Sequence, residues 1–91
     1  MQSVFIIEDD FHAEPHGEYP TLADAVAELK RLSLIPWNEP PNQAPCTNWQ
    51  TCGRTYAIIE YDTSSTPWLE INNIAGLDIR ASGTIFNEAL L

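Results

Sequence analysis

The stretch from residue 35 to residue 54 constrains the fold most, because it shows neither helical nor strand periodicity. It holds four of the seven prolines, both cysteines and two of the three tryptophans. A loop of this length inside a compact domain is usually either functional or disordered. Disordered segments are poor in aromatic residues, so we predict an ordered loop that packs against a small domain.

The segment from residue 3 to residue 9 is predicted to be a strand that is apolar on both faces. Val4 and Ile6 fall on one face, and Phe5 and Ile7 fall on the other. Such a strand is normally covered on both sides. Because one helix covers only one side, we expect the second cover to come from the 35–54 loop or from another copy of the chain.

A helix is predicted from Thr21 to about Ser33. The Thr21 side chain can cap the first turn, and the charge of Asp24 suits the positive end of a helix. Pro36 prevents any continuation. Five apolar residues at helical spacing form one stripe along the predicted helix. They are Leu22, Ala25, Val26, Leu29 and Leu32.

Three segments after the loop, at residues 54–62, 68–72 and 77–82, are predicted to be strands of a meander. Residues 73–76 are predicted to connect the second strand to the third. Residues 11–18 contain turn signals and are interpreted as a short strand with a turn or as irregular structure, and residues 84–86 as a last short strand. The sequence therefore predicts a single α+β domain over residues 1–91. It has a mostly antiparallel sheet of about four strands, one helix on one face, and the loop over part of the other.

The charge balance excludes some classes of partner. Thirteen acidic residues stand against four basic ones, which gives a formal net charge of -9. Binding to a phosphate backbone depends on Lys and Arg, so we expect no nucleic acid partner. We also expect no membrane partner and a cytoplasmic location, because the chain has no apolar run of ~20 residues and its start lacks the basic region of a secretory signal. An acidic surface keeps a small protein soluble or attracts a basic protein partner.

Two histidines and two cysteines are candidate zinc ligands, since zinc is bound by these residue types. The H-x3-H spacing of His12 and His16 occurs in zinc fingers, whereas the C-x5-C spacing of Cys46 and Cys52 is looser than the usual knuckle. The alternatives are two buried thiols that pack as small apolar groups and a disulfide that closes a short loop. A cytoplasmic location favours reduced or metal-bound cysteines over a disulfide. Zinc is the one cofactor that the sequence suggests.

A thiol enzyme would pair Cys46 with His12 or His16 and an acid. No local signature for such a pair is present in the sequence, and a small single-helix domain offers little depth for a substrate pocket. We therefore expect that the protein is not an enzyme.

Tryptophan and arginine are enriched where proteins bind each other, so four residues are candidates for partner binding. The alternative for the tryptophans is that they complete a small core, and the alternative for the arginine is an ion pair with a carboxylate such as Glu60, Asp62 or Glu70. The four candidates are Trp37, Trp49, Trp68 and Arg54.

A spaced pattern in the loop, P-C-x-x-W-x-x-C-G-R-x-Y over residues 45–56, follows the capped helix start at residues 20–25. Together they resemble a group of small bacterial proteins of unknown function, and the resemblance would cover most of the chain. It implies a bacterial, cytoplasmic, stand-alone domain. It carries over no activity, ligand or catalytic residue.

The functional expectation is a small non-enzymatic module that binds a protein partner or a second copy of itself. An immunity-type inhibitor that masks a basic nuclease or toxin is one form of this hypothesis, because its charge would be complementary. The alternative of a different class is a small Cys/His metal-binding protein.

Overall fold

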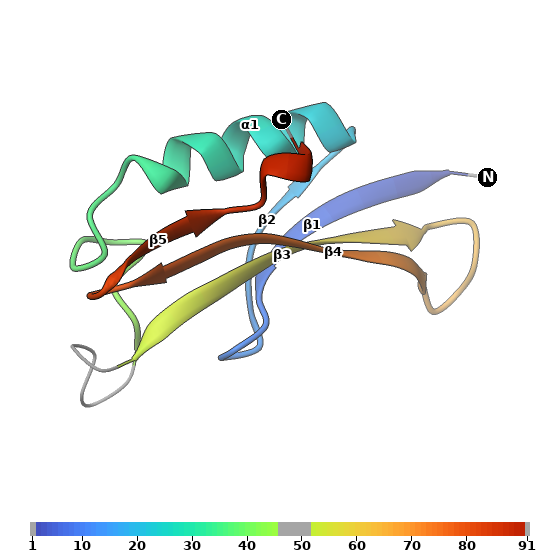
Figure 1. Cartoon of the computed structure of the whole chain (residues 1–91). Helices are drawn as coiled ribbons and strands as arrows, with labels where there is room; N and C mark the ends of the chain where they lie inside the picture. Colours follow the sequence, from blue (N-terminus) through green and yellow to red (C-terminus); the bar gives the residue numbers. More distant parts are fainter. Residues whose placement is uncertain (1, 46–51, 91) are drawn as a thin grey trace.

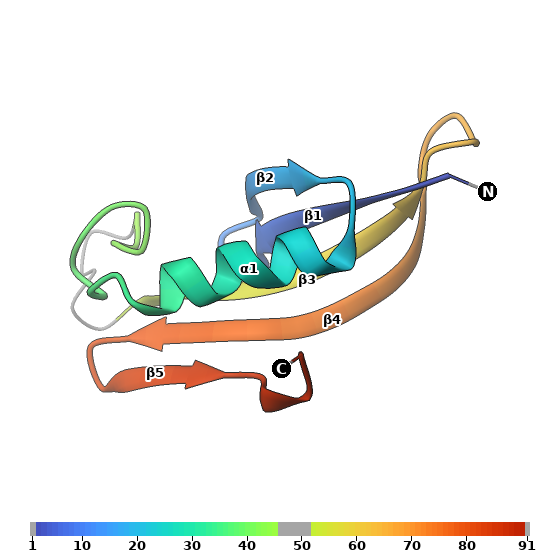
Figure 2. The same cartoon turned by 90° about the horizontal axis from the view of Figure 1, so that it is seen from above.

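The computed structural model describes residues 2–45 and 52–90 of the chain. In this part of the chain, five antiparallel strands form one sheet and a single α-helix lies across one of its faces (Figures 1 and 2). The strand order is β2-β1-β3-β4-β5. The predicted α+β class is confirmed, with five strands instead of about four. The elements are β1 (Ser3–Asp9), β2 (Glu14–Tyr19), α1 (Leu22–Ser33), β3 (Gly53–Asp62), β4 (Leu69–Arg80), β5 (Gly83–Phe86) and the 3-10 turn η1 (Glu88–Leu90).

Strand β4 corrects one prediction, because the strands expected at residues 68–72 and 77–82 are parts of one continuous strand, Leu69–Arg80, instead of two. Asn73, expected in a connection, pairs with Ile59 of β3. The register shifts at Gly76, so the residue bulges out while the strand continues on both sides. A Cβ atom on Gly76 would lie 2.6 Å from Leu29 Cδ1. The glycine therefore marks a close approach of α1 to the sheet and does not mark a turn.

Helix α1 begins as the sequence predicts. The Thr21 hydroxyl accepts a hydrogen bond from the backbone N–H of Asp24 at 3.1 Å. Within residues 2–45 and 52–90, no helix is long and apolar enough to cross a membrane. The buried side of α1 packs against the sheet to form the core. The fully buried core cluster consists of Ile7, Ala25, Leu29, Leu32, Tyr56, Ile58, Leu77 and Ile79.

The described part of the 35–54 loop packs on the same side of the sheet as α1. Ile35 and Trp37 are half-buried against the core cluster. On the opposite face, Ala57 and Ile59 in the centre of the sheet are only 2% and 3% exposed. The expected cover of that face by the rest of the loop concerns residues 46–51, which lie outside the described residues, so it stays a prediction.

Asn42 anchors the loop to the end of the helix. Its side chain is buried, and Nδ2 donates hydrogen bonds to the backbone oxygens of Leu32 and Ile35, both at 2.9 Å. The last carbonyls of a helix lack hydrogen-bond donors within the helix. Asn42 donates a hydrogen bond to one of these carbonyls, that of Leu32. The Tyr56 hydroxyl lies 3.3 Å from Asn42 Oδ1 and 3.3 Å from the Pro41 carbonyl oxygen. Burial raises the pKa of Tyr56 to about 12, so this hydroxyl keeps the proton that it donates.

Replacing Asn42 by alanine should lower the free energy of unfolding by ~1–2 kcal/mol, because the Leu32 and Ile35 carbonyls lose the hydrogen bonds from Nδ2, although the Leu32 oxygen keeps the one from the Ile35 N–H. Urea unfolding followed by circular dichroism measures the difference. Asn38→Ala is the matched control, since Asn38 lies in the same loop and is exposed. Equal stability of the two variants would contradict the role given to Asn42.

A second tie joins β2 to α1 through Glu28. Its Oε2 accepts hydrogen bonds from His16 Nε2 at 2.8 Å and from Arg31 Nη2 at 2.7 Å. The hydrogen bond from Arg31 is the largest cause that lowers the pKa of Glu28 to about 2; partial burial opposes it and His16 adds to it. The carboxylate therefore stays ionised in the folded protein at pH values where an unfolded glutamate takes up a proton.

The lowered pKa of Glu28 contributes stability that is present above pH 4.5 and is lost as the pH falls toward 2. Glu28→Gln should therefore reduce the free energy of unfolding by ~1–2 kcal/mol near neutral pH, allowing for screening by solvent. Below pH 4.5 the gap between wild type and variant should narrow steadily. Urea unfolding at pH 7, 5, 4 and 3 tests this, with the exposed Glu18→Gln as control. A gap that does not change with pH would contradict the assignment.

Candidate functional site

A polar cluster lies where the end of β1 meets the start of β3, and its centre is Asp9. The Asp9 carboxylate is 1% exposed. Its Oδ1 accepts hydrogen bonds from the backbone N–H groups of Phe11 at 3.1 Å and Thr55 at 3.0 Å. Its Oδ2 lies 2.6 Å from His12 Nδ1 and 2.9 Å from Arg54 Nη1. A buried carboxylate is stable only with such partners, and here they come from the β1–β2 turn and from β3.

Arg54 links this cluster to the loop. Besides Asp9, its guanidinium donates to Glu14 Oε1 at 2.6 Å and to the backbone oxygen of Gln43 at 3.0 Å. The expected ion pair exists, but the suggested acidic partners were wrong. Glu60, Asp62 and Glu70 lie toward the opposite end of the β3–β4 hairpin, whereas the antiparallel register brings the start of β3 beside the end of β1. Arg54 is therefore paired with two carboxylates, those of Asp9 and Glu14.

His12 connects Asp9 to Cys52. Its Nε2 lies 3.1 Å from Cys52 Sγ, while its Nδ1 faces Asp9. Cys52 is part of a disulfide bond, so the alternative of a buried free thiol is wrong for this cysteine. Cys46, the other cysteine of the sequence, lies outside the described residues. Asp9, His12 and Cys52 thus form a line of carboxylate, imidazole and sulfur.

The partners of His16 differ from those of His12. Its Nε2 bonds to Glu28, and its ring meets the ring of Tyr56 edge-on with centroids 5.9 Å apart. Among residues 2–45 and 52–90, no group of three or more His, Cys, Asp or Glu side chains is arranged to hold a metal ion. The predicted four-ligand zinc site includes Cys46, which lies outside the described residues, and it would need Cys52 as a free thiolate instead of the disulfide-bonded sulfur found here.

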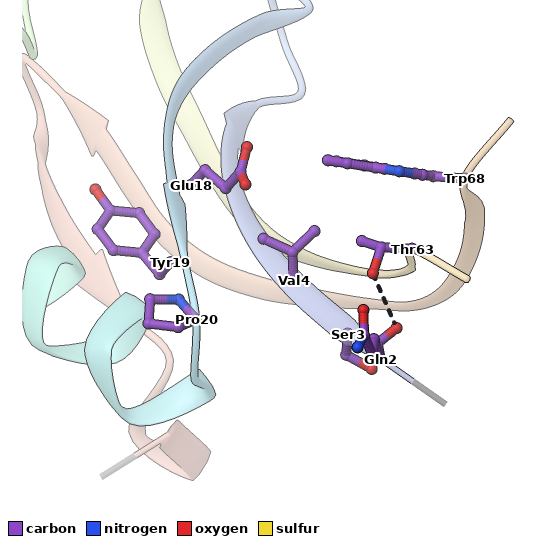
Figure 3. A pocket seen from close by; sticks show the side chains of 8 residues that line it. All are labelled: Gln2, Ser3, Val4, Glu18, Tyr19, Pro20, Thr63 and Trp68. Carbon is purple, nitrogen blue, oxygen red and sulfur yellow. Dashed lines mark hydrogen bonds between the residues drawn. The ribbon is translucent and has the colours of Figure 1, made fainter. Parts of the chain in front are cut away.

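The candidate tryptophans have different environments. Trp37 is half-buried against the core, and Trp49 lies outside the described residues. Trp68 is 44% exposed, with its ring centroid 6.2 Å from that of Tyr61. It borders an open groove of about 580 Å³ together with Val4 and Glu18, as Figure 3 shows. Trp68 is therefore the described tryptophan that is accessible to a partner.

The outer edge of β4 is a feature that the sequence analysis missed. Strand β5 pairs only with residues 77–80 of β4. Asn87 follows β5 and ends this pairing. Its backbone N–H donates a hydrogen bond to the Gly76 oxygen at 2.8 Å, and its Nδ2 donates one to the Ala75 oxygen at 2.6 Å. From Leu69 to Ile74, no strand in the described part of the chain lies beside the outer edge of β4 (Figure 2). The sequence predicts a connection at residues 73–76, so it does not predict one long strand with an open edge.

The surroundings of the β4 edge are acidic. Residues 55–79 contain four acidic residues and no lysine or arginine. Burial raises the pKa of Tyr61, and the carboxylates of Glu8, Glu70 and Asp10 raise it further. The hydroxyl of Tyr61 therefore lies in a negative potential. This end of the sheet favours cationic groups.

Comparisons with known proteins leave the geometry as the only guide to function. No family model matches the chain, and neither a curated protein nor a solved structure matches it.

Replacing Asp9 by asparagine should reduce the free energy of unfolding by ~2–3 kcal/mol, because Arg54 would lose one of its two carboxylate partners and keep only Glu14. Chemical unfolding followed by tryptophan fluorescence measures this loss. Asp10→Asn removes the same charge from the neighbouring exposed residue and should change stability by no more than ~0.5 kcal/mol. If both variants lost the same amount, Asp9 would not be the centre of the cluster.

Proposed function

We propose that the protein is a non-enzymatic protein-binding module, and that its partner adds an extended segment as a sixth strand along Leu69–Ile74 of β4. The open outer edge of β4 is the observation that carries this proposal. The unpaired N–H and C=O groups of such an edge form main-chain hydrogen bonds with an added strand.

The β4 edge lacks most of the usual features that protect a sheet edge against strand addition. Proteins protect their sheet edges with lysine, proline, bulges or short strands. The edge strand β2 carries Pro15 and a register shift beside it, and β5 spans only four residues. Residues 69–74 contain a single charged residue, Glu70, and no proline. Its one protective feature is a bulge at Ile71, which has no Cα partner on β3. Strand addition is therefore best supported at β4.

The side chains define the partner's chemistry. Leu69 is 54% exposed and Ile71 is 43% exposed, so the partner should bring apolar residues against them. The acidic surroundings favour lysine or arginine at the intervening positions. A second copy of the chain would bring Glu70 against an equally acidic edge, which opposes self-association. A basic protein fits better, as the inhibitor hypothesis also requires.

The test uses a nine-residue peptide of alternating lysine and valine with blocked ends, and a matched peptide with glutamate in place of lysine. Amide hydrogen exchange of the protein is followed by NMR with each peptide. The lysine peptide should slow exchange within residues 69–74, and its affinity should fall as salt rises. The glutamate peptide should have no effect.

Ile71→Ala should weaken binding of the lysine peptide by ~5-fold, because an apolar contact is lost. Ile85→Ala is the matched control, since Ile85 is an exposed isoleucine on β5, outside this edge. Slow exchange at residues 69–74 without peptide, together with a dimeric mass, would replace the partner by a second copy. Chemical-shift changes at the Trp68 indole without any in β4 would overturn the edge and place binding in the groove.

A further inference from the structure

We infer that the groove between Glu18 and Trp68 is a second binding site, which takes the side chain of an arginine on a protein partner. The inference goes beyond strand addition, and it rests on the proposed function only in that the partner is a protein. The groove is lined by residues of β1, of β2 and of the segment between β3 and β4, whereas the open edge belongs to β4. The two sites can therefore be tested separately.

The strand register brings the first wall of the groove onto the sheet face opposite α1. Ile7 packs in the core under α1, so Ile6 and Val4, which alternate with it along β1, point to the other face. Glu18 of β2 pairs with Ile6, and Tyr61 of β3 pairs with Val4. Paired residues share a face, so Glu18 and Tyr61 lie on it as well. Glu18 is thus a diagonal neighbour of Val4 across the strands, which is within reach of a long side chain.

The indole of Trp68 forms the opposite wall. Its ring centroid lies 6.2 Å from that of Tyr61, and 44% of the residue remains exposed. Figure 3 shows the indole edge-on, with one of its faces toward Thr63 and Val4, and Glu18 on the other side of Val4. Val4 is only 8% exposed and provides an apolar floor. The groove of about 580 Å³ therefore offers an aromatic ring and a carboxylate to the same occupant.

The charge of Glu18 has no partner in the part of the chain that the structure describes. Within residues 2–45 and 52–90, Arg31, Arg54 and Arg80 pair with other carboxylates, and Glu18 forms no ion pair. The neighbouring ring of Tyr61 lies in the negative potential described above. A cation that enters the groove therefore meets an unpaired carboxylate and favourable surroundings.

A guanidinium suits this groove better than an ammonium. It is planar, so it can stack on an indole face while its fork of N–H groups donates to a carboxylate. An ammonium is compact and strongly hydrated, and it has no flat face to stack. Thr63 and Gln2 also line the groove, and their side-chain oxygens are further acceptors for the five N–H groups of an arginine.

The source of the guanidinium is best sought in a protein. Arginine is enriched in protein interfaces, where long apolar stems pack beside aromatic rings. A chain with a net charge of -9 attracts a basic partner. The groove then holds one arginine of that partner, with Val4 against its stem and Glu18 and Trp68 at its head.

The first test titrates the protein with Nα-acetyl-arginine amide and follows the Trp68 indole N–H and the Val4 methyl signals by NMR. Both signals should shift, and the affinity should fall as salt rises, because the contact is partly ionic. Nα-acetyl-citrulline amide has a similar shape without the charge and should leave both signals in place. Nα-acetyl-lysine amide should bind at least ~3-fold more weakly, because it cannot stack. Equal shifts with the citrulline compound, or equal affinity for the lysine compound, would overturn the inference.

A second test changes each wall of the groove. Glu18→Gln should weaken binding of the arginine compound by ~3–5-fold, because the guanidinium loses its ionic partner. Trp68→Leu keeps an apolar side chain but removes the ring, and it should weaken binding by ~3–5-fold. Glu39→Gln is the matched control, since Glu39 is exposed and lies outside the groove. Wild-type affinity in Glu18→Gln, or the same loss in Glu39→Gln, would contradict the assignment.

The arginine compound is too short to add a strand, so the groove and the β4 edge can fail separately. Shifts at Trp68 with unchanged amide exchange in residues 69–74 support the groove, whichever result the lysine–valine peptide gives. Slow exchange in residues 69–74 with that peptide, but no response to the arginine compound, would keep strand addition and overturn the groove. If the Trp68 signal shifted on dilution of the protein alone, the occupant would be a second copy, and the assignment to a separate partner would be overturned.

Discussion

The buried carboxylate of Asp9 is the interaction on which one end of the molecule depends. It accepts from two backbone N–H groups, and it holds Arg54 and His12. Arg54 in turn reaches Glu14 on β2 and the backbone of Gln43 in the loop. One side chain therefore joins β1, the β1–β2 turn, β3 and the loop. Because an uncompensated buried charge is so costly, these segments have to keep their positions together.

At the other end of the molecule, the length of helix α1 limits how much of the sheet the helix can cover. Helix α1 and strand β4 each have twelve residues. A helix rises ~1.5 Å per residue, so α1 is ~18 Å long, whereas β4 at ~3.3 Å per residue is ~40 Å long. The helix can therefore cover only about half of the β3–β4 hairpin, and Figure 1 shows the hairpin extending past it. The exposed end of the hairpin carries Leu69 and Ile71, and β5 is too short to protect its edge.

These two constraints separate two kinds of chemistry. The end at Asp9 is densely hydrogen-bonded, and its charged groups are paired with one another. At the end near Trp68, no described strand pairs with the outer edge of β4, and the surroundings are acidic, which is the basis of the proposed strand addition. Strand β3 runs from one end to the other.

The sequence by itself determined the features that depend on neighbours in the chain. Thr21 and Asp24 predicted the start of α1, and the apolar spacing of Ala25 and Leu29 predicted its buried face, because capping and helical periodicity are local. Short runs of β-branched and aromatic residues, apolar on both faces, likewise predicted the strands at residues 3–9 and 54–62.

Only the tertiary structure decided which distant residues meet. The antiparallel register of β1 and β3 brings Asp9 beside Arg54, and the β1–β2 turn brings His12 to Cys52. Neither contact leaves a periodic signal in the sequence. Asn42 resembled any loop residue until its amide was found on the helix carbonyls, and Gly76 resembled a turn until its contact with Leu29 showed a bulge. Local patterns specify elements, whereas the packing of those elements in three dimensions creates the open β4 edge and the line of carboxylate, imidazole and sulfur.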